Sequence, residues 1–255
     1  MSQRLLGIDV GTGGTRAVLI DGNGTVVGSS TAEHAPFRSP ETGWAEQDPR
    51  DWWRATCQAV KQVMAASPTE PSEISAVGFS GQMHGAVLLD DAGEVLRPAL
   101  IWCDQRTANE AQELTEQIGA EKIIAWTSNP ALTNFTLTKL LWVRKHEPNL
   151  FARFRTLLLP KDYVRYRLTG EYGMDMADAS GTLLLDVAHR RWSSEMANAA
   201  GIPVSVLPLL FESPDVCATV SEAGAAATGL KQGTDRKSTR LNSSHSGESR
   251  MPSSA

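Results

Sequence analysis

Residues 5–21 read LLGIDVGTGGTRAVLID, two apolar runs joined by a turn of glycine and threonine. The apolar runs predict two β-strands on either side of the turn. Glycines in such a turn can take positive φ and let unpaired backbone N–H groups approach a ligand, so the turn can cradle phosphate. Asp9 ends the first strand, where its carboxylate can hold Mg²⁺ through water, and Arg16 follows the turn within reach of the same phosphates. The predicted phosphate-binding turn consists of Gly11, Thr12, Gly13 and Gly14.

Two other glycine loops do not fit this stretch. A P-loop would end in Gly-Lys-Ser or Gly-Lys-Thr, which occurs nowhere in the chain. A dinucleotide-binding loop would need a third glycine where Arg16 stands and a helix after it. Instead, the second apolar run leads into a turn at residues 21–24 and then a third strand. The stretch alone therefore leaves two interpretations open, a phosphate loop and a tight hairpin turn without a ligand.

Composition narrows the class of protein. With 255 residues, 41% of them hydrophobic, the chain can form one large domain or two small ones. A net charge of −5 argues against a nucleic-acid partner, which would need a basic surface, and favours small metabolites. Cys57, Cys103 and Cys217 fit neither a zinc site nor a disulfide framework and are expected to be reduced thiols. No apolar run reaches the length of a membrane span, so we expect a cytoplasmic protein without a membrane partner.

The first segments after the third strand alternate between helical and strand patterns. A helix is expected to follow Asp48, a good N-cap, with Pro49 at its first position. Residues 74–80 are short, apolar and β-rich and predict a strand that leads into a site. Residues 86–96 predict a hairpin.

The alternation continues in the second half of the chain. Amphipathic patterns predict helices over residues 107–119 and 137–146. The apolar residues 156–159 predict a buried central strand, because they do not alternate with polar residues. Asp162 is expected to cap the next helix, which stops at Gly170. The pattern as a whole predicts an α/β fold.

Candidate ligand contacts follow the strand that ends at residue 80. In an open α/β sheet, ligands gather beyond the carboxyl ends of the strands, which favours ligand contact at Met83 and His84. A structural role is the alternative for a lone histidine. Trp102 offers an aromatic face, with core packing as its alternative. Asp104 offers a carboxylate that can accept two hydroxyl protons, or that simply pairs with the arginine two residues later.

The sequence resembles the FGGY family of carbohydrate kinases. The Asp-x-Gly-Thr pattern between two strands is similar to the first phosphate loop of actin-like ATPases and sugar kinases, and later motifs narrow the resemblance to this family. These motifs are GWAEQDP at 43–49, SGQMHG at 80–85, IWCD at 101–104, KLLW at 139–142, LPKDY at 159–163 and DASGT at 178–182. The resemblance implies a ribonuclease H-like N-terminal domain over residues 1–234, with a mixed sheet flanked by helices.

The resemblance also implies an activity, the Mg²⁺-dependent transfer of the ATP γ-phosphoryl group to a sugar hydroxyl. It implies sugar contacts at Met83, His84, Trp102 and Asp104, and phosphate contacts at Asp9, residues 11–14 and Arg16, with Asp9 also holding the metal through water. D-xylulose is the implied substrate, because glycerol-phosphorylating members carry Arg-Glu at the positions of Met83 and His84. The alternatives are glycerol, ribulose or gluconate as substrate and, outside the class, a non-catalytic sugar-binding module or an actin-like ATPase. A homodimer is one assembly that the resemblance allows for the full-length enzyme.

The composition changes after Thr234. Residues 235–255 hold seven serines, four basic residues and two acidic ones, and only three apolar residues. Such a segment cannot bury a core, so we expect a disordered tail foreign to the family. Family members carry the general-base aspartate just beyond this point. The resemblance therefore implies that no catalytic residue lies within this chain and that the chain alone is inactive as a kinase.

Overall fold

The fold is built on a six-stranded mixed sheet. The computed structural model describes residues 3–237, in which the strands of this sheet lie in the order β13-β14-β5-β1-β2-β3. Their bounds are β1 Arg4–Val10, β2 Gly14–Asp21, β3 Val26–Glu33, β5 Ile74–Gly81, β13 Val216–Thr219 and β14 Asp235–Lys237. The first three strands pair antiparallel, as the glycine turn and the following hairpin predict, whereas β1 and β5 pair in parallel. The prediction of an α/β fold with a mixed sheet is confirmed.

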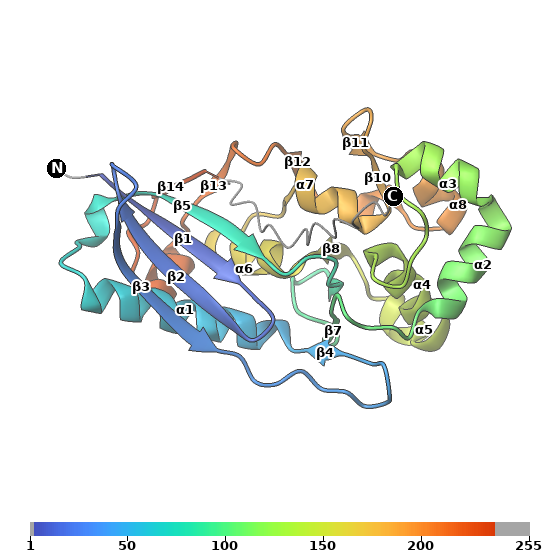
Figure 1. Ribbon diagram of the computed structural model, residues 1–255, viewed down its shortest axis with the longest axis horizontal. Helices are drawn as coiled ribbons and strands as arrows, with labels where there is room; N and C mark the ends of the chain where they lie inside the picture. Colours follow the sequence, from blue (N-terminus) through green and yellow to red (C-terminus); the bar gives the residue numbers. More distant parts are fainter. Residues whose placement is uncertain (1–2, 238–255) are drawn as a thin grey trace, which may run out of the picture.

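Three helices pack together against this sheet. Their bounds are α1 Pro49–Ala66, α6 Pro160–Thr169 and α9 Glu222–Thr228. α1 runs along the sheet in Figure 1 and begins as predicted, because the Asp48 carboxylate accepts a hydrogen bond from the N–H of Arg50. Trp52 on α1 is fully buried and shares one apolar cluster with Leu6 and Ile8 of β1. The alternate residues of β1 thus form the core face of the sheet.

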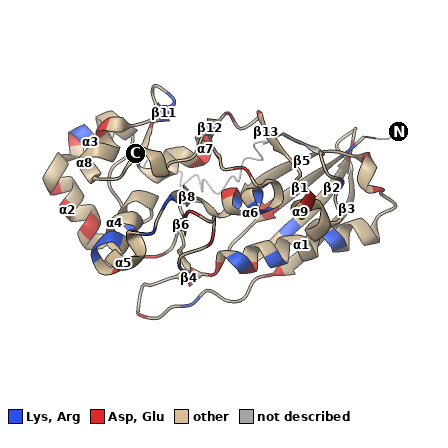
Figure 2. Cartoon of the chain, turned by 180° about the vertical axis from the view of Figure 1, so that it is seen from behind, with Lys and Arg blue, Asp and Glu red and all other residues tan. Residues whose placement is uncertain are grey.

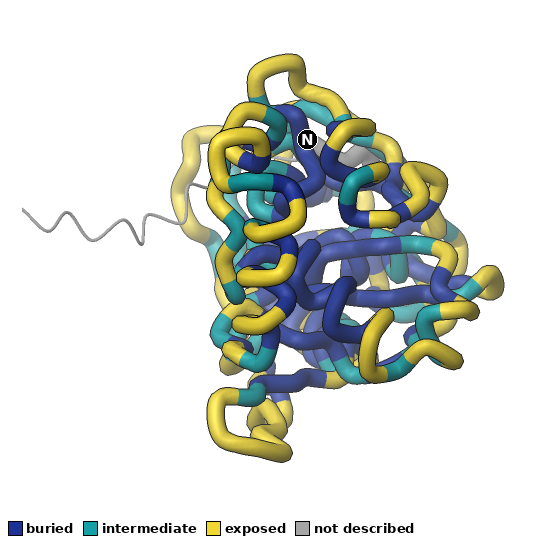
Figure 3. The backbone as a smooth tube through the Cα atoms, turned by 90° about the vertical axis from the view of Figure 1, so that its right-hand side faces the viewer, coloured by how far each residue is buried: buried dark blue, intermediate teal, exposed yellow. Residues whose placement is uncertain are grey.

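A second apolar cluster lies at the opposite end of the molecule from the sheet (Figure 1). Helices surround it: α2 Ala108–Ile118, α3 Ala120–Thr127, α4 Thr136–His146, α5 Pro148–Phe151 and α8 Ser194–Ala200. The helices predicted over residues 107–119 and 137–146 are confirmed as α2 and α4. In Figure 3 the buried segments run through the middle of the molecule and the exposed segments surround them.

The strand expected over residues 156–159 is buried but not central. Within the described part of the chain, β8 (Thr156–Leu158) pairs only with β6 (Val87–Leu89), in a separate two-stranded antiparallel sheet. The apolar run reflects burial between the two clusters, which a sequence pattern cannot distinguish from burial within a central sheet. The hairpin over residues 86–96 forms its turn, with a bridge between Leu89 and Val95, but its first strand takes β8 as its ladder partner.

Short elements connect these layers. They are β4 Glu46–Gln47, β7 Ala99–Leu100, β9 Met174–Asp175, β10 Leu185–Asp186, β11 Arg191–Trp192, β12 Leu210–Phe211, α7 Met176–Ala179, and the 3₁₀ turns at Pro71–Glu73, Ser180–Thr182 and Val204–Val206. The predicted cap of α6 is wrong, because Leu159 is the N-cap and Pro160 begins the helix, which places Asp162 inside its first turn. Gly170 ends α6 with a φ of 79°, as predicted.

The boundary predicted after Thr234 does not coincide with the end of the sheet. β14 covers Asp235–Lys237 and Asp235 pairs with Ala76 of β5, so the sheet includes three residues of the segment expected to be disordered. The rest of that segment lies outside the described residues. Figure 2 shows acidic and basic residues interspersed along α1 and α6. Within residues 3–237, no helix is both long and apolar enough to cross a membrane.

Candidate functional site

The glycine turn between β1 and β2 is a tightly packed loop. The N–H of Gly11 donates to the carbonyl of Gly14 (3.0 Å), and the N–H of His34 donates to the carbonyl of Gly13 (3.0 Å). A Cβ atom on Gly14 would lie 2.8 Å from the carbonyl oxygen of Ala32, so only glycine fits there. Gly13 has no neighbour within 4 Å of such an atom, which leaves open space on that side of the loop.

Asp9 and Arg16 lie side by side at the base of this loop. They are directly opposite each other in the β1–β2 register, and Asp9 also pairs with Ser80 of β5. Opposite residues of paired strands point to the same face, so the carboxylate and the guanidinium share one face of the sheet. Both residues are exposed. Mg²⁺ keeps several waters and needs one or two carboxylates besides substrate phosphates, so an exposed lone Asp9 beside a glycine loop fits the predicted site.

The side-chain amides of Gln47 and Gln82 hydrogen-bond to the backbone of this loop. Gln47 donates to the carbonyl of Thr12 (2.7 Å), and its side-chain oxygen accepts from Gln82 (3.0 Å) and from the indole N–H of Trp52 (3.1 Å). Gln82 also donates to the carbonyl of Gly11 (3.3 Å). From the sequence alone, a glutamine beside a helix cap that holds a loop cannot be told from one that is simply a polar loop residue.

A histidine supports the loop from the side of β3. His34 lies 2.8 Å from the hydroxyl of Thr15 through Nε2 and 3.4 Å from the carbonyl of Thr12 through Nδ1. Burial lowers the pKa of His34, which favours the neutral ring. The side chains that contact this loop, His34 among them, are therefore uncharged.

Met83 and His84 follow β5 directly, next to the loop that follows β1. Met83 is 45% exposed. His84 has a φ of 62° and lies in a three-residue turn, closed by a hydrogen bond from the N–H of Gly85 to the carbonyl of Met83 (2.8 Å). Such a turn is rare and costs about 1–3 kcal/mol for a residue other than glycine. Strain of this kind concentrates at functional sites.

The imidazole of His84 has a defined partner. Its Nδ1 lies 2.8 Å from the carbonyl oxygen of Gly181, which can only accept a hydrogen bond. Nδ1 therefore carries the proton. Burial lowers the pKa of His84 and outweighs the opposing effect of the Gly181 carbonyl, so the neutral ring is favoured. In that form Nε2 is a hydrogen-bond acceptor.

Trp102 reaches the glycine turn. It is 46% exposed, and its indole N–H donates to the hydroxyl of Thr12 (3.0 Å). The structure thus joins a residue predicted to contact sugar with a residue predicted to contact phosphate. Three of the four predicted sugar residues, Met83, His84 and Trp102, retain surface from which a ligand could be contacted.

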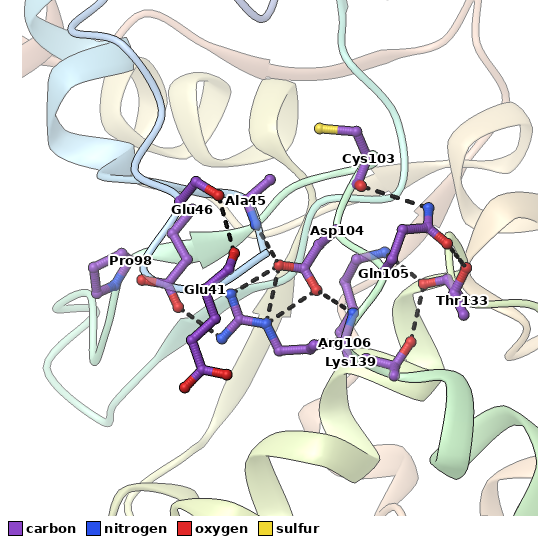
Figure 4. A network of polar contacts seen from close by, with 12 residues as sticks. Glu41, Ala45, Glu46, Pro98, Cys103, Asp104, Gln105, Arg106, Thr133 and Lys139 are labelled. Atoms are coloured by element: carbon purple, nitrogen blue, oxygen red, sulfur yellow. Dashed lines mark hydrogen bonds and ion pairs between the residues drawn. The ribbon is translucent and has the colours of Figure 1, made fainter. Parts of the chain in front are cut away.

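Asp104 is the exception among the predicted sugar residues. Its side chain is 0% exposed, and its carboxylate accepts hydrogen bonds from the N–H of Ala45 (2.7 Å) and from the Arg106 guanidinium (2.8–3.0 Å) (Figure 4). No surface of the carboxylate is left for a ligand. The structure shows the pairing with Arg106 that the sequence allowed, and direct contact of Asp104 with a sugar stays a prediction that this pairing does not favour.

Asp104 ends a chain of alternating buried charges. Arg106 also pairs with Glu46 (2.8 Å), Glu46 with Arg97 (2.5 Å) and Arg97 with Glu147 (2.5 Å). The guanidinium of Arg106 stacks 3.7 Å from the centre of the Trp44 ring. Most of these groups are shielded from water, where removal of one partner would leave a buried charge unpaired at a high cost. The network fixes residues 101–106, and with them Trp102.

Two buried lysines lie deeper in the molecule. Lys139 donates to the carbonyls of Thr133 (3.4 Å) and Asn134 (2.5 Å), and burial lowers its pKa to about 7. Lys161 contacts the carboxylates of Asp162 and Asp178 (3.1 and 2.8 Å) and also that of Asp175, which caps α7. Burial opposes the charge of Lys161, but the three carboxylates outweigh it and raise its pKa. Within residues 3–237, no group of three or more acidic, histidine or cysteine side chains could hold a metal ion.

Comparison with known proteins identifies the class. Residues 4–235 match the N-terminal domain of the FGGY family of carbohydrate kinases, and the chain belongs to this family. The motifs between residues 43 and 182 predicted this family correctly.

The chain is similar to individual members of this family that are named xylulose kinase. The xylulose kinase of Klebsiella pneumoniae is 46% identical over 211 residues, which cover 83% of this chain and 43% of the relative. That of Bacillus subtilis is 40% identical over 230 residues, 90% of this chain and 46% of the relative. The chain spans about half the length of the curated relatives it matches.

Solved structures confirm the fold. The xylulose kinase of Rhodospirillum rubrum has a TM-score of 0.88 at 31% identity and aligns over 92% of this chain and 48% of its own. A gluconate kinase from Lactobacillus acidophilus has a TM-score of 0.86 at 25% identity, over 93% of this chain and 47% of its own. The ribonuclease H-like α/β fold predicted from the sequence is the fold of these sugar kinases.

Proposed function

We propose that this chain forms the sugar and phosphate side of an ATP-dependent kinase that phosphorylates D-xylulose at its C5 hydroxyl. The observation that carries the proposal is the parallel pairing of β1 and β5. It brings two loops to the same edge of the sheet, the glycine turn after β1 and the Met83–His84 turn after β5. Ligands of open α/β sheets bind at such an edge.

The residues of this edge suit phosphoryl transfer, in which the protein mainly aligns donor and acceptor and offsets charge. The N–H groups of the glycine turn and the guanidinium of Arg16 would contact the phosphates of ATP. Asp9 would hold Mg²⁺ through water, and Mg²⁺ when bound offsets phosphate charge. The general base is expected in the part of the family fold that follows Thr234.

The sugar side uses three residues. Nε2 of the neutral His84 would accept a hydrogen bond from a sugar hydroxyl, while the side chain of Met83 would lie along the carbon backbone. The exposed face of Trp102 would pack on sugar C–H groups. D-xylulose is favoured over glycerol because the chain carries Met83 and His84 and because its relatives include kinases named for xylulose. The cytoplasmic location and the homodimer stay predictions.

A substrate panel tests this proposal. The assay needs a full-length chain, made by joining residues 1–234 to the C-terminal half of a xylulose kinase relative, and follows ADP release with xylulose, ribulose, glycerol or gluconate. We expect xylulose to have the highest kcat/KM. A clear preference for glycerol would refute the xylulose assignment.

Two variants of the same full-length chain test the assignment of residues. His84→Ala should mainly raise the KM for xylulose, because it removes a ground-state contact, whereas Asp9→Ala should mainly lower kcat. Arg4→Ala, at the partly buried start of β1 and far from its carboxyl end, serves as the control and should change neither constant. An unchanged KM for His84→Ala would show that the sugar lies elsewhere.

A further inference from the structure

The backbone of His84 is held in place independently of its ring. The three-residue turn fixes its φ at 62°, and the hydroxyl of Thr136 at the start of α4 donates to its carbonyl (3.2 Å). With the backbone fixed, the direction of the imidazole depends on what the ring itself touches.

Two contacts confine the ring. On one side, the ring of Phe135 packs edge to face with the imidazole, with 5.3 Å between the ring centres. On another, the carbonyl of Gly181 accepts the hydrogen bond from Nδ1 (2.8 Å). Among the described residues, none hydrogen-bonds to Nε2. The two contacts leave Nε2 as the free polar atom of the ring.

Glycine is required at position 181 because there is no space for a side chain, and not because of the backbone conformation. It lies in the 3₁₀ turn Ser180–Thr182, which any residue can adopt, and its φ is not positive. A Cβ atom at this position would lie 2.5 Å from Cε1 and 2.6 Å from Nδ1 of His84. Because real Cβ contacts are longer than this, an alanine would displace the imidazole.

The turn that carries Gly181 is itself anchored. Asn129 donates to the carbonyl of Ser180 (3.1 Å), and the hydroxyl of Thr182 donates to the carbonyl of Ala179 (2.6 Å). The carbonyl of Gly181 is therefore a fixed acceptor rather than one that follows the ring.

We propose that Gly181 is a positioning residue that sets the tautomer and direction of His84, so that Nε2 faces the substrate as a hydrogen-bond acceptor. The proposal deepens the proposed function and rests on it. It assigns a role to the DASGT motif, whose glycine the sequence did not single out. A substrate hydroxyl that donates to Nε2 is the group this arrangement selects.

The tautomer can be measured on the 255-residue chain without any activity. Nitrogen-15 NMR of the histidine rings distinguishes a protonated Nδ1 from a protonated Nε2, and His84→Gln identifies the His84 signals. We expect His84 to be neutral with the proton on Nδ1 at pH 7.5. A ring with the proton on Nε2, or an equal mixture, would overturn the proposal.

Gly181→Ala tests the spatial requirement, with Gly22→Ala as the matched control. Gly22 does not have a positive φ, and its added Cβ would meet only the carbonyl of Gln3 at 3.8 Å. The atoms that collide with the methyl group added at position 181 belong to a side chain, so we expect the fold to persist while the ring moves. Gly181→Ala should shift the His84 nitrogen signals, and Gly22→Ala should leave them in place. Unshifted signals in a folded Gly181→Ala chain would overturn the proposal.

Kinetics in the full-length chain described above separate this inference from the proposed function. Gly181→Ala should raise the KM for xylulose by about 3- to 10-fold, the range expected for one hydrogen bond, with a smaller change in kcat. If His84→Ala raises KM and Gly181→Ala does not, the role of Gly181 is refuted while the sugar site stands. If His84→Ala has no effect, the proposed function fails, whatever the NMR result.

A second pair of variants tests the same geometry without changing Gly181. The amide of asparagine can replace Nδ1 and that of glutamine can replace Nε2, so His84→Gln should raise KM less than His84→Asn. The opposite order would contradict the direction assigned to the ring.

Discussion

At the scale of single residues, Lys139 is a lysine whose amino group is buried in the folded protein. Burial lowers its pKa from 10.5 to about 7, so between these values the folded state holds fewer protons at this site than the unfolded state. The free energy of unfolding contributed by this site therefore rises with pH across that window. Below pH 7 both states are protonated and the cost of burying the charge is fully present.

Lys139→Met should remove this dependence. From pH 7 to pH 9, the native chain should gain about 2 kcal/mol of unfolding free energy relative to the variant. Urea denaturation of both chains at pH 6, 7, 8 and 9 measures the difference, in which the other titrating groups cancel. A difference that does not change with pH would mean that Lys139 stays charged in the folded protein.

Asp104 gives a second prediction at this scale. Asp104→Asn leaves the buried Arg106 short of one counter-charge, so we expect the unfolding free energy to fall by about 2–4 kcal/mol, less than for a pair with no other partner because Glu46 remains. The KM for xylulose in the full-length chain should change less than it does for His84→Ala. A large rise in KM with unchanged stability would instead restore Asp104 as a sugar contact.

At the scale of elements, two loops meet through one hydrogen bond. The indole N–H of Trp102 donates to Thr12, so the loop over residues 101–106 and the glycine turn hold each other in place. A double-mutant cycle with Trp102→Phe and Thr12→Val measures this coupling, because phenylalanine keeps an aromatic face and valine keeps the shape of threonine.

The cycle should show a coupling free energy of about 0.5–1.5 kcal/mol in kcat/KM. Trp102→Phe alone should also raise the KM for ATP, although Trp102 is a proposed sugar contact. Additive effects of the two variants would show that the loops act independently.

The elements also show what a sequence can and cannot predict. The glycine turn, the cap at Asp48 and the strand before Met83 were predictable because each is a local pattern of a few residues. The partner of the strand over residues 156–158 was not, because its apolar run fits any buried strand. The pairing of Asp104 with Arg106 was visible as an alternative, but its burial depends on Ala45 and Glu46, which are distant in the sequence.

At the scale of the whole molecule, the chain corresponds to the N-terminal domain of its family. The sequence predicted the family and the fold from motifs, and its prediction of sugar contacts at Met83, His84 and Trp102 stays a prediction. It missed Gln82 and Gly181, whose roles arise only when β1, β5 and the DASGT turn come together. Single residues of this kind carry no periodic or compositional signal.

We predict that the 255-residue chain alone has no substantial kinase activity. Absence of a general base typically costs about 10²- to 10⁴-fold, and absence of donor positioning can cost a further 7–11 kcal/mol or so. A coupled ADP-release assay with xylulose and Mg-ATP should give a turnover at least about 10²-fold below that of the full-length chain. Turnover within the usual enzyme range of about 1–10³ s⁻¹ would contradict the prediction.

The parallel pairing of β1 and β5 also determines the order in which the two loops can form during folding. β1, β2 and β3 are joined by short turns, whereas Leu5 must find Ala76 across a long intervening chain. Closing such a loop costs entropy that local hairpins avoid. We therefore expect the glycine turn to form early, and the Met83–His84 turn to take its place beside it only when the distant strand docks. We therefore predict that the proposed sugar site is complete only once this long-range strand pairing has formed.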